Sequence, residues 1–117
     1  MKQYTTNEQT AKLIKLGFKK PNGWYVDGVM NNVKLYVNID ENPMMFNYSI
    51  GELIEMLPRT IKNYYDLNIF STSQGWWVLY GMIGDGDMWS VEYELYRKEL
   101  IDALYAMIVK LKEEGVI

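Results

Sequence analysis

The sequence predicts an α+β fold, in which an antiparallel sheet of about five strands, including a three-stranded meander, carries three helices. Three segments are bounded by residues typical of helix ends, and several others alternate between apolar and polar residues with a period of two. A length of 117 residues fits one domain, so we predict a single α+β domain over residues 1–117. The long C-terminal helix is expected to pack across the sheet.

The first predicted helix covers Asn7–Leu16. Thr6 and Gln9 have the spacing of a capping box, in which each side chain satisfies a backbone N–H group of the first turn. Gly17 follows and can adopt the left-handed conformation that commonly ends a helix.

The second predicted helix covers Ile50–Leu57. Ser49 and Glu52 form another capping box, and apolar residues recur on one side of the helix. Pro58 ends the helix because a proline disfavours helical geometry at the residue before it.

The third predicted helix is the longest and covers about Tyr96–Glu114, with Gly115 at its end. Apolar residues occupy most of its circumference. We therefore expect other parts of the molecule to cover it on more than one side.

The strands are predicted from alternation over residues 34–39, 65–69 and 89–94. Residues 76–83 are apolar on both faces, which indicates a central strand. Alternatively, residues 90–98 begin the last helix, with Ser90 as its cap. The predicted hairpin loops are Ser71–Gly75, Gly84–Asp87 and an earlier turn at either Asp27–Gly28 or Asn31–Asn32.

The chain contains no histidine and no cysteine. Histidine is the usual general base near neutral pH, and cysteine is the usual thiol nucleophile and a main ligand of structural zinc. We therefore expect no metal, no cofactor and no catalytic residues. Asp85-Gly86-Asp87 lacks the spacing of a calcium loop and is interpreted as a tight turn.

Charge is distributed unevenly along a chain whose net charge is −3. The first 20 residues hold five lysines and one acid, so Lys12, Lys15, Lys19 and Lys20 are the candidate contacts for a nucleic acid. The remainder of the chain is acidic, and we do not expect a nucleic-acid partner. A polar start and the lack of a long apolar run predict a cytoplasmic protein with no membrane segment.

Aromatic residues are in surplus, with four Trp, ten Tyr and three Phe. Alternation places Tyr36 and Tyr64 on the sheet face opposite the helices, and Trp77 is expected to join them. Together with the broad apolar face of the third helix, these residues present more apolar surface than a two-layer domain can cover. These three residues are the candidate partner-binding residues. The alternative is that loops or a second subunit cover this face.

Several segments of the chain resemble a set of short uncharacterised proteins found in gut bacteria, in their phages and on their mobile elements. The likeness implies a phage or mobile-element accessory protein, and it carries over no activity and no functional residue. The segments are 4–9, 16–18, 48–58, 76–80, 99–108 and 111–117.

The favoured function is a small non-enzymatic protein-interaction module whose partner is another protein or a second copy of the chain. One alternative is a single-stranded nucleic-acid binder that combines the exposed aromatic residues with the N-terminal lysines. The least favoured alternative is a hydrolase that uses paired carboxylates, drawn from Glu92, Glu94, Glu99 and Asp102.

Overall fold

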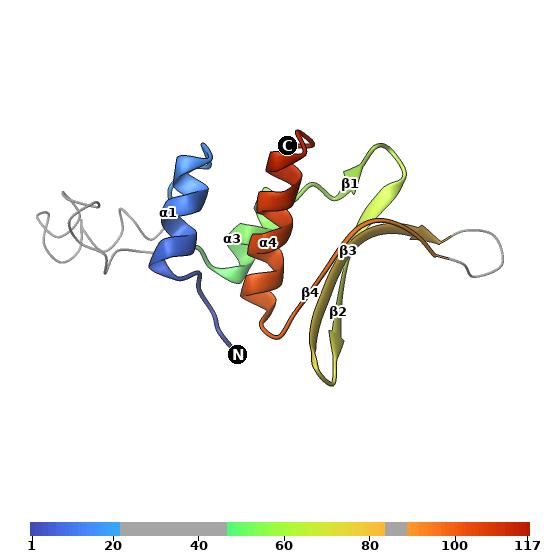
Figure 1. Ribbon diagram of the computed structural model, residues 1–117, viewed down its shortest axis with the longest axis horizontal. Coiled ribbons are helices and arrows are strands. Elements are labelled where there is room, and N and C mark those ends of the chain that lie inside the picture. The colour runs from blue at the N-terminus through green and yellow to red at the C-terminus, as the bar shows by residue number, and fades with distance from the viewer. Residues whose placement is uncertain (22–46, 84–88) are drawn as a thin grey trace, which may run out of the picture.

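A computed structural model of the chain describes residues 1–21, 47–83 and 89–117. It confirms the α+β class, with helices beside an antiparallel sheet whose strand order is β1-β2-β3-β4 (Figure 1). In chain order the elements are α1 (Asn7–Lys15), α3 (Ile50–Met56), β1 (Thr60–Ile61), β2 (Tyr65–Thr72), β3 (Gly75–Ile83), β4 (Trp89–Arg97) and α4 (Leu100–Glu113).

The sheet confirms the predicted meander β2-β3-β4, with β3 paired on both sides. The described part of the chain holds four strands where about five were expected. The predicted strand at 34–39, its hairpin turn and the turn at Gly84–Asp87 lie outside the described residues. β2 and β3 also run further into their hairpin than predicted, because Thr72 pairs with Gly75 and only two residues lie between them.

Both short helices begin at the predicted capping boxes. In α1 the Gln9 amide donates to the Thr6 hydroxyl at 3.1 Å, and the Thr6 amide donates to the Gln9 side chain at 2.9 Å. Ser49 and Glu52 exchange the same two hydrogen bonds at the start of α3. Gly17 is left-handed, with a φ of 101°, as the predicted end of α1 requires.

The third helix begins four residues later than predicted, at Leu100 instead of Tyr96. Tyr96 and Arg97 belong to β4, where they pair with Trp77 and Trp76. The prediction failed because an apolar residue just before a helix fits the helical pattern as well as it fits a strand. The strand interpretation of residues 90–98 is confirmed over Trp89–Arg97, and the helical alternative is wrong.

The short strand β1 was not predicted. It is joined to β2 by a tight turn in which Lys62 and Asn63 both have positive φ, at 52° and 66°. The Tyr64 amide donates to the Ile61 carbonyl at 3.2 Å and closes this turn. A left-handed lysine is uncommon, so the sequence offered only Asn63 as a signal.

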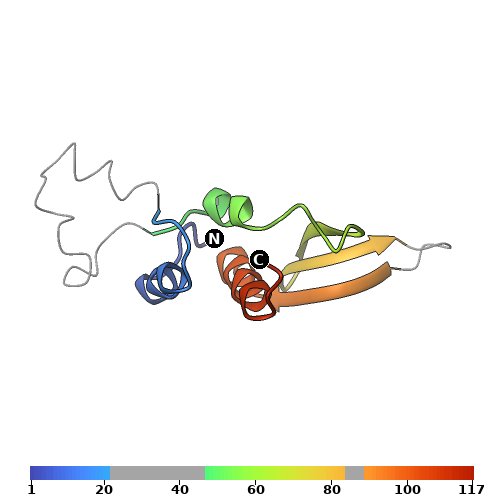
Figure 2. The same cartoon turned by 90° about the horizontal axis from the view of Figure 1, so that it is seen from above.

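Helix α4 lies at the centre of the structure, with the sheet on one side, α1 on the other and α3 beside it (Figures 1 and 2). Its apolar circumference is covered on more than one side, as predicted. The chain itself provides this cover. The expectation that the helix and the outward-facing aromatic residues together exceed what one domain can cover stays a prediction. Seven of its residues are buried: Leu100, Ile101, Ala103, Leu104, Met107, Ile108 and Leu111.

Lys2 ties the N-terminal segment to the beginning of α4. Its ammonium group donates to Asp102 Oδ1 at 2.9 Å, and its backbone amide donates to Glu99 Oε2 at 3.0 Å. Gln9 donates to the same Asp102 oxygen at 2.9 Å. Burial pushes the pKa of Asp102 upward, but the hydrogen bonds from Lys2 and Gln9 outweigh it, so the pKa falls below the ordinary 3.8.

Asp102→Asn should therefore lower stability at neutral pH by less than about 1 kcal/mol, because the pair is partly exposed to solvent. Because the pKa of Asp102 is lower in the folded state than in the unfolded state, its ionised carboxylate stabilises the fold at pH values above the unfolded-state pKa. This contribution is lost as the pH falls through the folded-state pKa. The urea midpoints of wild type and Asp102→Asn should thus differ at pH 7 and converge as the pH falls through the lowered pKa of Asp102. A difference that does not change over this range would contradict the assignment.

Gly75, in the hairpin between β2 and β3, and Gly51, in α3, provide a matched test of the packing. A Cβ on Gly75 would lie 2.6 Å from the Arg97 carbonyl oxygen, and its φ is 149°. Gly75→Ala should cost about 1–3 kcal/mol of stability. A Cβ on Gly51 in α3 would make only an ordinary contact of 3.9 Å with Ser49 Oγ, so Gly51→Ala should instead stabilise the fold by about 0.5–1 kcal/mol. Urea denaturation of both variants checks the opposite signs, and equal effects would refute the close approach at Gly75.

Candidate functional site

The sheet has one face in the core and one face turned away from it. Alternate residues along each strand point to opposite faces. Those that pack against the core are Tyr65, Leu67 and Ile69 of β2, Trp76, Val78 and Tyr80 of β3, and Tyr93 and Leu95 of β4. The residues between them define the outer face.

Three aromatic residues lie directly opposite one another on the outer face. Phe70 of β2 pairs with Trp77 of β3, which pairs with Tyr96 of β4. The Trp77 ring centroid is 5.5 Å from that of Phe70 and 6.4 Å from that of Tyr96, with interplanar angles of 36° and 26°. We call Phe70, Trp77 and Tyr96 the aromatic row.

The outer ends of the row are accessible to solvent. Phe70 is 37% exposed and Tyr96 is 49% exposed, whereas Trp77 between them is half-buried. The next outer-face residue of β3, Leu79, is fully buried. Between Leu79 and the hairpin, the exposed apolar surface of this face is therefore that of the row.

Hydrogen bonds hold two of the rings in place. Trp77 Nε1 donates to Glu94 Oε1 at 3.2 Å, and the Tyr96 hydroxyl donates to the Thr72 hydroxyl oxygen at 2.7 Å. Thr72 in turn donates to the Gly75 carbonyl at 3.0 Å. The row is thus a fixed surface whose ring orientations are set before any partner arrives.

The three predicted partner-binding residues do not form one surface. Trp77 is on the outer face as predicted. Tyr64 is 63% exposed but lies in the turn before β2, against Tyr65, with ring centroids 5.9 Å apart. It precedes Phe70 by six positions, or roughly 20 Å of strand. Tyr36 lies outside the described residues.

Sequence reasoning missed Phe70 and Tyr96. The predicted alternation of β2 stopped at Ile69, although one more step would have placed Phe70 beside Asn68 on the outer face. Tyr96 was assigned to the last helix. The register that aligns the two with Trp77 is a long-range property that no local pattern contains.

The candidate lysines do not reach the aromatic row. Lys12 and Lys15 lie on α1, and Lys19 and Lys20 follow it. Because α1 packs on the side of α4 that is remote from the sheet, these lysines and the outer face lie at opposite sides of the molecule (Figures 1 and 2).

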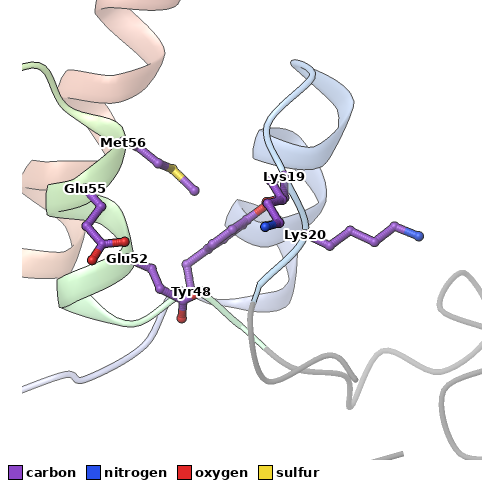
Figure 3. A pocket seen from close by; sticks show the side chains of 6 residues that line it. All are labelled: Lys19, Lys20, Tyr48, Glu52, Glu55 and Met56. Atoms are coloured by element: carbon purple, nitrogen blue, oxygen red, sulfur yellow. The ribbon is translucent and has the colours of Figure 1, made fainter. Parts of the chain in front are cut away.

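A pocket of about 150 Å³ lies between α3 and the segment after α1. Figure 3 shows the ring of Tyr48 between α3 and this segment, with Lys20 directed away from α3. The Tyr48 hydroxyl donates to the Lys19 carbonyl, and burial, helped by nearby Glu52, raises the pKa of Tyr48 to about 12. The pocket is smaller than the usual 300–1,000 Å³ of ligand sites, and its tyrosine serves packing.

Each of the four candidate carboxylates has a structural partner. Glu92 pairs with Lys62 at 3.2 Å, and this hydrogen bond raises the pKa of Lys62. Glu94 accepts from Trp77, while Glu99 and Asp102 accept from Lys2. These contacts give each of the four side chains a structural role, so a catalytic role is not needed to explain their positions.

Within residues 1–21, 47–83 and 89–117, no group of three acidic side chains is placed to hold a metal ion. In the same part of the chain, no helix has the length and apolar character needed to cross a membrane. Asp85 and Asp87 lie outside the described residues.

Comparison of the chain with protein-family models, with curated proteins and with solved structures finds no match.

Proposed function

We propose that the protein is a small non-enzymatic interaction module of the cytoplasm, an accessory of a phage or mobile element, and that it binds another protein through the aromatic row. The observation that carries this proposal is the alignment of Phe70, Trp77 and Tyr96 across three strands, outside the core and exposed at both ends. Large aromatic side chains of this kind are typical binding hot spots.

The orientation of the rings favours a protein over a nucleic acid. A base stacks on the open face of an aromatic ring. Trp77 has a neighbouring ring beside each of its faces, with centroids 5.5 Å and 6.4 Å away, so the indole offers mainly an edge. An edge suits the shape complementarity and exclusion of water that a protein surface provides.

The carboxylate beside the row also favours a protein partner over a nucleic acid. Glu94 lies beside Trp77, and a carboxylate there opposes a phosphate backbone. The N-terminal lysines of the nucleic-acid alternative lie across the molecule, beyond α4. The single-stranded nucleic-acid alternative thus has its described aromatic residues and its N-terminal lysines on opposite sides of the molecule, and each of the four carboxylates named for the hydrolase alternative has a structural partner.

Trp77→Ala should weaken binding of a protein partner about 30-fold, because truncating a hot-spot tryptophan commonly costs about 2 kcal/mol. Tyr64→Ala is the matched control, since it removes an exposed aromatic ring outside the row. The partner is identified by capture from the native host, and the affinities of wild type and variants for the purified partner are then measured by calorimetry.

Circular dichroism should show that both variants remain folded. Equal affinities of Trp77→Ala and wild type would refute the proposal. An affinity for single-stranded DNA or RNA that falls steeply with salt and depends on Lys12 and Lys15 would instead favour the nucleic-acid alternative.

A further inference from the structure

Strand β4 is an edge of the sheet in the described structure. It pairs with β3 along one side, and no other strand of the described residues pairs with its other side. At nine residues it is as long as β3. A strand edge carries unpaired backbone N–H and C=O groups, which can template the addition of another strand.

A β-bulge divides this edge into two halves. The register between β3 and β4 shifts at Tyr80/Gly81, which leaves Glu92 as the extra residue of β4. Bulges commonly protect edges from pairing, because they bend and twist the strand. The half from Tyr93 to Arg97 keeps a regular register and is therefore the half that can accept a strand.

We propose that this half of β4 pairs antiparallel with β4 of a second copy of the chain, with Tyr96 of one copy opposite Tyr96 of the other. This inference rests on the proposed function, because it assigns one partner to the aromatic row. Pairing at Tyr96 would join the two rows into one line of six rings across a continuous sheet.

The register follows from charge complementarity. In an antiparallel pair, directly opposite residues share a face. With Tyr96 on the two-fold axis, Glu94 of each copy faces Lys98 of the other, one residue beyond the end of β4, so two oppositely charged pairs form. Both residues are exposed, and Glu94 is on the outer face.

The neighbouring registers are less complementary. With Glu94 on the axis, the two Glu94 carboxylates oppose each other, which is unfavourable. With Leu95 on the axis, Glu94 lies opposite Tyr96, which separates the two aromatic rows, and Lys98 lies opposite Glu92, the bulged residue that already pairs with Lys62. Of these three registers, only pairing at Tyr96 both joins the rows and matches the charges.

A single cysteine tests the contact directly, because the chain contains none of its own. Opposite residues of antiparallel strands have Cα atoms about 4.5–5.5 Å apart, within the range that a disulfide bridges. Tyr96→Cys should therefore form a disulfide-linked dimer under mild oxidation at low protein concentration. Phe70→Cys, at the far end of the row, should remain monomeric on the same non-reducing gel.

Trp77→Cys distinguishes a different dimer, in which two outer faces stack on one another. Crosslinking at residue 77 without crosslinking at residue 96 would overturn the edge pairing in favour of stacked sheets. Equal crosslinking at 70, 77 and 96 would indicate random collision and would also overturn it.

Charge exchange tests the register with Tyr96 intact. Glu94→Lys alone and Lys98→Glu alone should each raise the dimer dissociation constant roughly tenfold, because each places like charges opposite one another. The double variant should recover most of the wild-type affinity in sedimentation velocity. Glu113→Lys, on the exposed side of α4, makes the same charge change as Glu94→Lys and should have no effect.

A strictly monomeric wild type at all concentrations would overturn the second copy as partner. In that case the loss of a different captured protein on Trp77→Ala would still support the proposed function. A dimer whose double variant is no tighter than the single variants would overturn the register.

Discussion

The burial of α4 between the sheet and the other helices is the constraint on which the rest of the structure depends. Seven of its fourteen residues are buried, and the core formed by β3, α1 and α3 converges on them. Only Lys98 and Glu99 separate α4 from β4. The position of the helix therefore fixes the end of β4, and Gly75 allows the neighbouring hairpin to approach that end closely.

This arrangement makes the two faces of the sheet unequal. The inner face is stabilised by the core, whereas the aromatic row is held by its own ring contacts and by hydrogen bonds to Glu94 and Thr72. Apolar area outside the core contributes little to folding until a second surface removes it from water. The row thus has more free energy to gain from a partner than any part of the inner face.

The parts of the fold that depend on local chemistry could be predicted from sequence. The capping boxes at Thr6 and Ser49 and the strand pattern of β2 to β4 are set by residues a few positions apart, and the structure confirms them. The candidate site depends on register, which aligns Phe70 with Trp77 and Tyr96 over long sequence separations. The sequence pattern predicts the exposure of Tyr64, but only the register shows that Tyr64 lies six positions along the chain from Phe70, the β2 partner of Trp77.

The chemistry of the row also constrains what can bind it. Trp77 Nε1 is already bonded to Glu94, and the Tyr96 hydroxyl is bonded to Thr72, so the row has few free donors to offer. Contact must come mainly from the exposed rings of Phe70 and Tyr96 and from the edge of Trp77, with Glu94 as a negative group at the margin. A complementary surface is therefore apolar at its centre and carries a cation at its rim, since an interface core is apolar and its rim polar. A second β4 supplies both, with Tyr96 at the centre and Lys98 at the rim.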